Sequence, residues 1–128
     1  MRLLLDTHAF LWWASEDERL SKPARAAIEA PSAEVFLSTA SIWEACIKWR
    51  LGKLPLPDHP SRYLPTQLAK GDVAPLDIRM HHVLHITELP DHHNDPFDRI
   101  IISQARLEDM TIVTRDENIR HYDAKTLW

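Results

Sequence analysis

Short apolar runs alternate with longer helical patterns from one end of this chain to the other, and this alternation limits the possible folds. The runs that we predict to be strands are Arg2–Leu5, Glu34–Leu37, Val73–Leu76, Thr111–Thr114 and the edge strand Thr126–Trp128. Parallel strands need a crossover connection that is usually a helix, so strands separated by helices predict a parallel sheet with helices on both faces. The expected fold class is therefore α/β, built as a three-layer sandwich.

The segments between these runs carry helix signals. The predicted helices are Thr7–Ala14, Ser21–Ala30, Thr39–Leu51, a weaker one from Ser61 to Gly71, Arg79–Leu89, a long one from Pro96, and the short turn Asp116–His121. The two glycines of the chain, Gly52 and Gly71, both stand where a helix is expected to end. Glycine is the residue type that a left-handed helix cap favours.

Length and composition set further limits. The 128 residues contain no internal repeat, so we expect one domain over residues 1–128. The single Cys46 cannot form an internal disulfide, which indicates the cytoplasm. No apolar run approaches the roughly 18 residues of a membrane span, and Asp6 and His8 interrupt the first run before a signal-peptide core could form. The formal net charge of -4 argues against a bulk electrostatic grip on nucleic acid.

Acidic residues are placed at one edge of the predicted sheet. Asp6 comes directly after the first strand, Glu44 lies on the helix after the second, and Asp116 follows the fourth. Asp98 stands at the head of the helix from Pro96. Functional groups of open α/β sheets gather beyond the carboxyl ends of the strands, so we expect the four carboxylates to share one pocket. An oxygen-only cluster of negative charge favours a hard cation, Mg²⁺ or Mn²⁺, over zinc.

Each acid also has a purely structural interpretation. Asp6 and Asp116 could cap the helices that follow them, and Ser41 to Glu44 fits a capping box. Asp95 precedes a proline at a helix start, so we favour capping for it and keep contact with metal or water as an alternative. Taken singly, each acid favours the structural interpretation, whereas four acids at one edge favour a site.

Four segments carry further information through their order along the chain: Leu4–Trp13, Ser38–Glu44, His93–Arg99 with the helical Ile100–Ala105 after it, and Thr114–Asp116. They resemble, in this order, the four motifs of PIN-domain nucleases of the VapC toxin type. The resemblance extends over nearly the whole chain.

The resemblance implies a PIN-like sandwich and the activity of a Mg²⁺- or Mn²⁺-dependent endoribonuclease. It implies hydrolysis of RNA phosphodiester bonds by a metal-activated water, restraint of this toxin by a cognate antitoxin, and a homodimer. Carried over by position, Asp6 and Asp98 would be the principal metal ligands, and Glu44 and Asp116 would help to hold metal-bound water.

Other residues near the expected site are given supporting roles. By the same resemblance, Thr7 and Thr114 would orient the carboxylates through hydrogen bonds. The basic candidates for contact with RNA phosphates are Lys48, Arg50, Arg99 and Arg115. Trp12 and Trp13 are adjacent on a helix and point about 100 degrees apart, so we expect one of them to contribute to an antitoxin groove or a homodimer face. The core is expected to take the remaining tryptophans, Trp43, Trp49 and Trp128.

Three other interpretations remain open at this point. His81 and His85 share a helix face and could contribute to a zinc site, although no full tetrahedral ligand set is evident. A receiver-type phosphoacceptor domain has a similar length and acids at its strand ends, but it would want paired acids after the first strand and a lysine after a late one. Instead Thr7 follows Asp6, and arginine follows Thr114. The third interpretation is a protein-binding module with this fold and no useful turnover.

Overall fold

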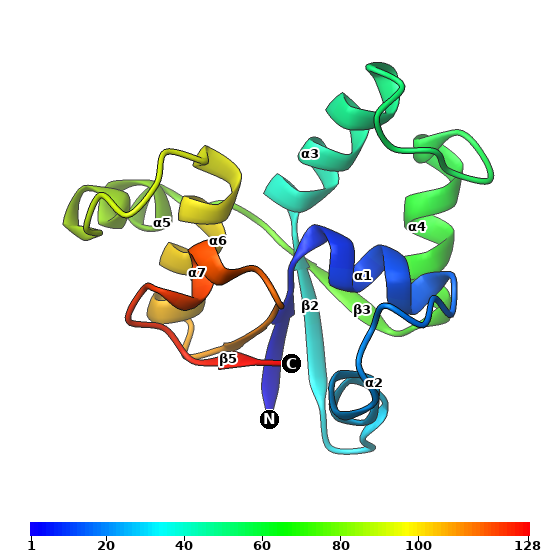
Figure 1. The fold of residues 1–128 in the computed structure, drawn as a ribbon, viewed down its shortest axis with the longest axis horizontal. Helices are drawn as coiled ribbons and strands as arrows, with labels where there is room; N and C mark the ends of the chain where they lie inside the picture. The colour runs from blue at the N-terminus through cyan, green and yellow to red at the C-terminus, as the bar shows by residue number, and fades with distance from the viewer.

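A parallel sheet forms the centre of the molecule (Figure 1). The computed structural model describes all 128 residues, and its sheet has five strands in the order β3-β2-β1-β4-β5. The strands are β1 (Arg2–Leu5), β2 (Glu34–Ser38), β3 (Val73–Leu76), β4 (Thr111–Val113) and β5 (Thr126–Leu127), and every neighbouring pair is parallel. The predictions of five strands, a parallel sheet and the α/β class are confirmed.

The strand order reverses at β1. The chain runs outward through β2 and β3 on one side of β1, and later fills the other side with β4 and β5. Such a reversal opens a crevice at the carboxyl ends of the two central strands, because the connections leave them toward opposite faces of the sheet. The carboxyl ends of β1 and β4 are therefore where the topology leaves room for a site.

Helices cover both faces of the sheet. They are α1 (Thr7–Ala14), α2 (Lys22–Glu29), α3 (Thr39–Arg50), α4 (Pro60–Lys70), α5 (Met80–His85), the 3-10 turn η1 (Ile86–Glu88), α6 (Pro96–Leu107) and α7 (Glu117–Arg120). In Figure 1 the first four lie to one side of the strands, and α5, α6 and α7 lie to the other. No helix of the structure combines the length and the apolar composition that crossing a bilayer would require.

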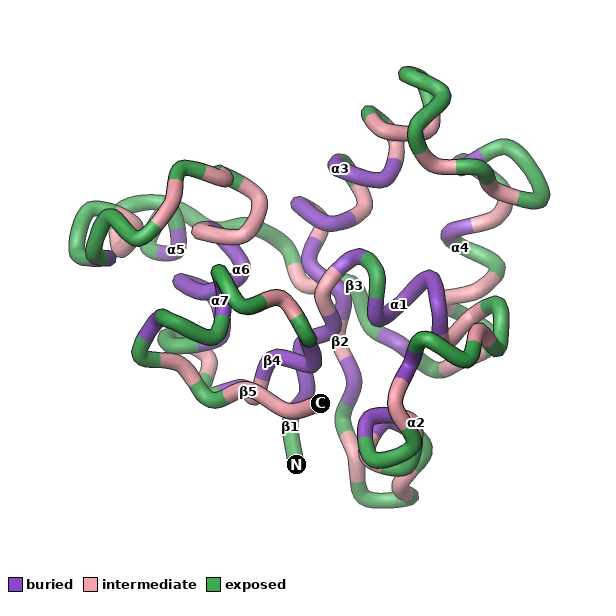
Figure 2. The backbone as a smooth tube through the Cα atoms, viewed as in Figure 1, coloured by how far each residue is buried: buried purple, intermediate pink, exposed green.

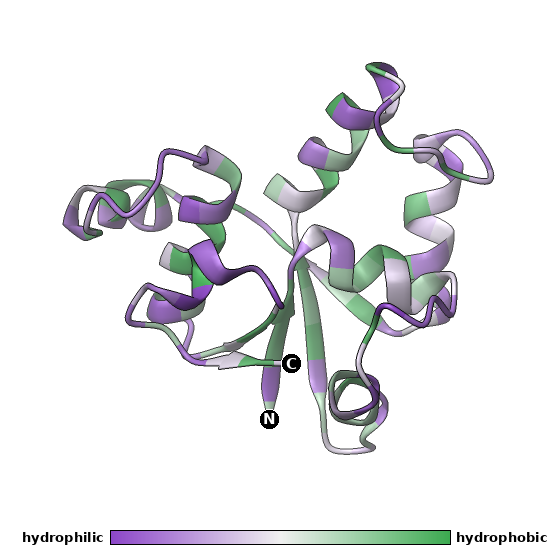
Figure 3. Ribbon diagram, in the orientation of Figure 1, coloured by the Kyte–Doolittle hydropathy of each residue, from purple (hydrophilic) through white to green (hydrophobic).

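The core is divided into two layers by the sheet itself. Leu3 and Leu5 of β1 point into a cluster with α1, α2 and α4, whereas Leu4 points into a second cluster with α6 and α7. All three leucines are fully buried, because a central parallel strand is covered on both faces. Burial and hydropathy follow the same pattern, with the apolar strands inside and the polar helix faces outside (Figures 2 and 3).

Some helix ends were predicted correctly from nearby residues, and others were not. Ser21 accepts a hydrogen bond from the Ala24 N–H at 3.1 Å and caps α2, as predicted. Gly52 has a φ of 73°, the left-handed conformation expected after α3. Gly71 has a φ of −93°, so a different constraint selects it: an added Cβ would lie 2.0 Å from Cη2 of Trp13. The single helix predicted over Arg79–Leu89 is wrong, because it divides into α5 and η1.

Candidate functional site

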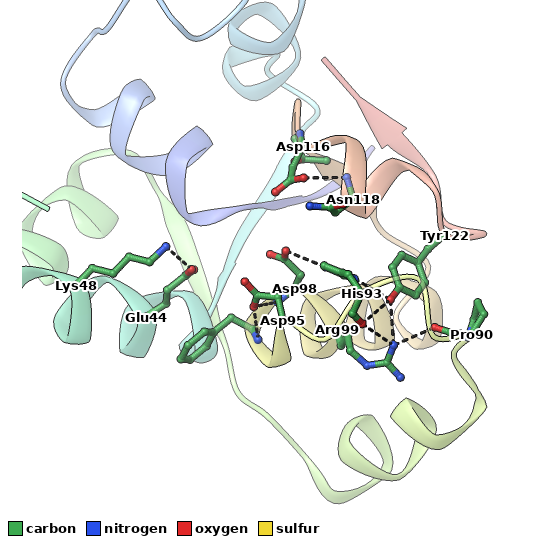
Figure 4. A network of polar contacts seen from close by, with 12 residues as sticks. Glu44, Lys48, Pro90, His93, Asp95, Asp98, Arg99, Asp116, Asn118 and Tyr122 are labelled. Carbon is green, nitrogen blue, oxygen red and sulfur yellow. Dashed lines mark hydrogen bonds and ion pairs between the residues drawn. The ribbon is translucent and has the colours of Figure 1, made fainter. Parts of the chain in front are cut away.

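The four predicted acids line one small pocket at the carboxyl edge of the sheet. Its volume is about 80 Å³, and its wall consists of Asp6, Thr7, His8, Ser41, Glu44, Lys48, Asp95, Phe97, Asp98, Ile101 and Asp116. These residues come from the ends of β1 and β4 and from helices α1, α3 and α6. Figure 4 shows Glu44, Asp98, Asp95 and Asp116 around this space. Residues up to 110 positions apart in the chain therefore meet because the parallel strands end at one edge.

Asp6 both caps a helix and faces the pocket. Its Oδ1 accepts a hydrogen bond from the Ala9 N–H at 2.7 Å, which caps α1. Burial raises the pKa of the Asp6 carboxyl above its usual value, and hydrogen bonds from the Thr114 side chain and the Ala9 N–H counteract this rise. The capping and site interpretations of Asp6 are therefore compatible, because one carboxylate has acceptor positions for both partners.

Glu44 is buried on α3 and is held from two sides. The Thr7 hydroxyl donates to its Oε1 at 2.5 Å, and Lys48 Nζ donates to its Oε2 at 2.8 Å. The capping-box interpretation of Ser41 to Glu44 is wrong: α3 begins at Thr39 with Ser38 as its N-cap, so Glu44 lies beyond the first turn. The hydrogen bond to Glu44 raises the pKa of Lys48. Lys48 thus acts in this structure as the counter-charge of a buried carboxylate.

Asp95 and Asp98 divide two tasks at the start of α6. Oδ1 of Asp95 accepts hydrogen bonds from the N–H groups of Phe97 at 2.9 Å and of Asp98 at 3.1 Å, which confirms capping. The Asp98 side chain turns into the pocket, where its Oδ2 lies 3.1 Å from Nε2 of His93. Burial raises the pKa of Asp98 to about 6, with the carboxylates of Asp95, Asp116 and Glu44 contributing in the same direction against the contact with His93.

A chain of hydrogen bonds from Arg99 through Tyr122 and His93 runs behind Asp98 (Figure 4), and the sequence did not indicate the role of Tyr122. Arg99 Nη1 donates to the Tyr122 hydroxyl at 3.0 Å, and this hydroxyl lies 2.9 Å from Nδ1 of His93. With the arginine as donor, the tyrosine O–H can donate to Nδ1, and Nε2–H of His93 is then directed at Asp98. Tyr122, just after α7, thus orients His93 in the loop before α6 so that the imidazole N–H points at the Asp98 carboxylate.

The other predicted basic residues have different environments. Nη1 of Arg99 also donates to the Pro90 carbonyl at 2.9 Å, so this guanidinium holds the loop before α6. Arg50 is exposed near the end of α3. Arg115 is exposed beside the pocket and engages only the ring of Trp12. Their contacts with RNA stay predictions. Arg50 and Arg115 both have free hydrogen-bond donors, but Arg50 lines the groove between α3 and α4, and only Arg115 lies beside the acidic residues Asp6 and Asp116.

Asp116 completes the wall from the β4 side. Its Oδ1 accepts a hydrogen bond from the Asn118 N–H at 2.9 Å and caps α7, while its own N–H donates to the Thr114 hydroxyl at 3.0 Å. Thr114 is fully buried. The predicted supporting threonines, Thr7 and Thr114, thus both make hydrogen bonds within the acidic cluster.

The chemistry of the pocket fits a hard divalent cation. Five carboxylates and a single lysine line it, and uncompensated like charges that are partly buried favour proton uptake. The raised pKa values of Asp6 and Asp98 express this excess of negative charge. The donor set contains only oxygen, which suits Mg²⁺ or Mn²⁺. No three of these carboxylates have oxygens within 4.8 Å of one another, and a cation such as Mg²⁺ binds through few carboxylates and keeps several waters.

The histidine cluster on α5 has a structural explanation. His81, His82 and Glu108 lie close enough to share an ion, but Nδ1 of His82 accepts a hydrogen bond from the Arg79 N–H at 2.9 Å. A neutral imidazole then carries its proton on Nε2, which lies 3.0 Å from Glu108. Both nitrogens of the fully buried His82 are therefore in use, and these contacts hold α5 against α6 instead of forming a zinc site.

The tryptophans are distributed differently from the prediction. Trp12 is 8% exposed and packs edge-on against Trp128 with ring centroids 6.0 Å apart, and Trp13 is half-buried. Their predicted role at a partner face stays a prediction. The expectation that Trp43 lies in the core is wrong, because it is 62% exposed on α3.

An apolar groove of about 440 Å³ lies between α3 and α4. It is lined by Ile42, Trp43, Cys46, Ile47, Trp49, Arg50, His59, Pro60, Ser61, Leu64, Pro65 and Leu68. Trp43 and Ile47 on α3 and Leu51 at its C-cap are spaced four residues apart and are all exposed. This apolar stripe was visible in the sequence as helical spacing, but its direction depends on which face of α3 the sheet covers.

Comparison with known proteins shows which proteins this chain is similar to. The family model of the PIN domain matches residues 3–125. Ribonuclease VapC16 of Mycobacterium tuberculosis is 36% identical over 61 residues, which are 48% of this chain and 43% of that protein. The match thus spans less than half of the length of this curated relative.

Solved structures share the complete fold. VapBC2 from Rickettsia felis, bound to a DNA fragment from the promoter, is similar with a TM-score of 0.73 and 15% identity over 99% of this chain and 98% of that one. VapBC-1 from nontypeable Haemophilus influenzae has a TM-score of 0.60 and 16% identity over 99% and 97% of the two chains. At such identities the likeness establishes the fold, and it confirms the predicted three-layer sandwich.

Proposed function

The chain belongs to the PIN domain family, and on this premise we propose that it is a divalent-metal-dependent endoribonuclease, the toxin of a toxin–antitoxin pair. The observation that carries the proposal is the convergence of Asp6, Glu44, Asp98 and Asp116 on one pocket at the point where the strand order reverses. The name of the relative VapC16 supports ribonuclease activity. Helix capping by Asp6, Asp95 and Asp116 does not by itself explain why so many carboxylates gather in one partly buried pocket.

In this proposal Asp6 and Asp98 are the principal ligands of Mg²⁺ or Mn²⁺, with Glu44 and Asp116 beside them. When bound, such a cation supplies positive charge for a phosphodiester and lowers the pKa of a coordinated water. The chain itself orients the ligands: Thr7 and Lys48 hold the two oxygens of Glu44. Each of these bonds reduces the rotamer freedom that metal binding would otherwise have to remove.

His93 has a comparable role toward Asp98. Its Nε2 lies 3.1 Å from Oδ2, and Asp95 fixes the helix start that carries Asp98. One oxygen of Asp98 is thus oriented by the protein, and the other stays available to a cation. Partners of this kind behind a metal ligand fix its orientation and tune its basicity.

An RNA-cleavage assay tests the proposed activity. The purified protein is incubated with a mixed-sequence single-stranded RNA in Mg²⁺, in Mn²⁺ or in EDTA, beside Asp6→Asn and Asp98→Asn. The matched control is Asp72→Asn, because Asp72 is exposed, precedes β3 at the opposite edge of the sheet, and has a φ of 53° that asparagine tolerates. We expect cation-dependent cleavage in the wild type and the control, and loss of cleavage in both site variants.

The outcomes separate the interpretations. Cleavage that survives both site substitutions would show that another site or a contaminant is responsible. Mg²⁺-dependent thermal stabilisation that disappears in Asp98→Asn without cleavage of any RNA would favour a metal-binding module without turnover. A receiver-type phosphoacceptor is disfavoured by membership of the PIN domain family, and a stable aspartyl phosphate after incubation with a small phosphodonor would reinstate it.

A cognate antitoxin is the protein partner that we propose. The similar structures are complexes of toxins with antitoxins, and this chain exposes an apolar groove between α3 and α4. Trp43 and Ile47 are 62% and 36% exposed there, and isolated soluble proteins rarely leave contiguous apolar patches uncovered without a binding role. We assign this groove to an apolar segment of the antitoxin.

Co-expression with the protein encoded beside this chain tests the assignment. We expect Ile47→Glu to prevent co-purification, because it places a charge in the apolar groove. Leu107→Glu is the control, since Leu107 is 41% exposed at the C-terminal end of α6, away from the groove. Equal recovery of the partner with both variants would refute the groove as the interface. We also propose a cytoplasmic homodimer, for which the mass in light scattering is the check.

A further inference from the structure

A second cleft adjoins the acidic pocket, and we propose that it holds the backbone of a single-stranded RNA, with Arg115 binding a phosphate next to the one that is cleaved. This inference rests on the proposed nuclease function. It assigns the path of the substrate and one residue that grips it.

The second cleft and the acidic pocket share walls. The cleft has a volume of about 420 Å³ and is lined by Asp6, His8, Trp12, Arg19, Arg115, Asp116 and Trp128. Asp6, His8 and Asp116 also line the acidic pocket. A chain molecule that leaves the pocket on the β4 side therefore enters this cleft. Because Arg115 directly precedes Asp116 in sequence, the backbone ties the position of the cation to that of the acid.

Two arginines lie against the same indole ring in this cleft. The guanidinium carbon of Arg115 is 4.4 Å from the ring centroid of Trp12, and that of Arg19 is 4.9 Å away. Trp12 cannot move easily, because it is buried and packs against Trp128. The ring thus serves as a rigid support on which planar guanidinium groups stack.

The two arginines differ in whether they are neutralised. Arg19 donates from Nε and Nη2 to the two carboxylate oxygens of Asp17, at 3.1 and 2.7 Å. Arg115 forms no ion pair and no side-chain hydrogen bond with the protein, and the pKa of Asp17 is lowered mainly by Arg19 and only weakly by the charge of Arg115. A guanidinium that stacks through its face keeps its N–H donors in the plane, directed outward. Arg115 is therefore a free, pre-oriented cation beside a site of excess negative charge.

A phosphate is the group that such an arrangement fits. Guanidinium binds phosphate through two parallel hydrogen bonds, and charge-assisted bonds of this kind are about twice as strong as neutral ones. The chain has a formal net charge of -4, and five carboxylates surround the adjacent pocket, so a polyanion needs a local cation to approach. Arg115 supplies this positive charge in the cleft that we assign to the RNA backbone.

The dimensions of the cleft select a single strand. A volume of about 420 Å³ is that of a pocket for a small molecule. Double-stranded RNA is instead bound through its shape across a wide surface. A cleft of this size therefore suits one unpaired strand better than a duplex.

A binding assay tests this inference. Fluorescence anisotropy of a short, labelled, mixed-sequence single-stranded oligoribonucleotide is measured in Mg²⁺ with Asp98→Asn protein, in which cleavage is expected to be absent. Into this protein we introduce Arg115→Ala, Arg115→Lys, Arg19→Ala or Arg106→Ala. Arg106 is the matched control, because it is exposed, forms no ion pair, and lies near the C-terminal end of α6 beside a different cleft.

We expect Arg115→Ala to weaken binding about tenfold, as loss of a charge-assisted hydrogen bond predicts. The slope of log affinity against log salt should decrease in magnitude by about 0.7, the value for one phosphate contact of a single strand. Arg115→Lys should restore the slope and only part of the affinity, because lysine keeps the charge without the planar fork. Arg19→Ala should weaken binding less, since Asp17 already neutralises Arg19.

The inference is overturned if Arg115→Ala binds RNA like Arg106→Ala, or if a duplex annealed from the probe competes as well as the single strand. A merely structural role of Arg115 would instead lower the urea midpoint of unfolding and leave the salt slope unchanged. Cleavage kinetics with Asp98 intact separate the two proposals. If the wild type cleaves RNA and Arg115→Ala cleaves it with the same KM, only this inference is refuted. If the wild type neither binds nor cleaves RNA, the nuclease function is refuted and this inference with it.

Discussion

Replacing Asp98 by asparagine should stabilise the metal-free protein while it removes the proposed activity. The Asp98 side chain is 17% exposed, and burial together with neighbouring carboxylates raises its pKa from 3.8 to about 6. One pKa unit corresponds to about 1.4 kcal/mol, so ionised Asp98 costs the folded protein about 3 kcal/mol at high pH. Asparagine keeps a carbonyl oxygen for the contact with His93 and removes the charge.

The sign of the pH dependence follows from linkage. Because the pKa of Asp98 in the folded protein lies above 3.8, the stability that this group contributes is fully present below that pH and is lost as the pH rises through about 6. About half of this free-energy cost is present at pH 5, because Asp98 is already ionised in the unfolded chain at that pH but is still mostly protonated in the folded protein. The advantage of Asp98→Asn over the wild type should therefore grow by about 1–2 kcal/mol between about pH 5 and pH 8.

Urea unfolding in EDTA at these two pH values measures the difference. Asp72→Asn serves as the control, since its carboxylate is exposed and lies away from the acidic pocket. Addition of Mg²⁺ should then raise the unfolding free energy of the wild type, because a ligand of the native state stabilises it, and should leave that of Asp98→Asn nearly unchanged. A difference that is flat with pH, or a less stable variant at pH 8 in EDTA, would refute the assignment of excess charge to this carboxylate.

Three further predictions concern the packing and the site. Gly71→Ala should lower the unfolding free energy by about 1–3 kcal/mol, because its methyl group would lie 2.0 Å from Cη2 of Trp13; Gly71→Ala combined with Trp13→Leu should recover part of this loss, and no recovery would contradict the clash. Thr7→Val should cost about 1–3 kcal/mol in urea unfolding, because it leaves Oε1 of the buried Glu44 without its donor, and wild-type stability of this variant would count against the bond. Mg²⁺ affinity measured by calorimetric titration should fall as the pH drops through about 6, because protonated Asp98 cannot serve as a ligand; an affinity independent of pH over this range would exclude Asp98 from the ligand set.

The proximity of the acidic residues was predictable from local patterns. Each of Asp6, Asp116 and Glu44 follows a strand or lies on the helix after one, and parallel strands end at a common edge. Hydrophobic periodicity and the turn residues between segments locate such strands in the sequence. The residues that directly follow each strand, at the carboxyl edge of the sheet, are located at the same time. The capping interpretations were local too, and the structure shows that capping and facing the pocket coexist for Asp6 and Asp116.

Contacts between distant segments were beyond the reach of these patterns. Tyr122 approaches His93 across 29 residues, and no spacing rule relates these positions. Arg19 lies on the loop after α1 and was not considered, although it shares the ring of Trp12 with Arg115. The exposure of Trp43 depends on the rotation of α3 about its axis, which turns Ala40 and Ala45 into the core.

The amino-acid sequence by itself determined the strand and helix order, the parallel sheet, and the edge at which the acidic side chains gather, because these follow from periodicity, chain connectivity and the direction of parallel strands. Tertiary structure alone decided how the cations are arranged around the acidic pocket. Lys48 is held by Glu44 and Arg19 by Asp17, whereas Arg115 keeps its donors unused. These two ion pairs are local, four and two residues apart, whereas the stacking of Arg19 and Arg115 on Trp12 joins different elements, and only the packed fold sets such distances.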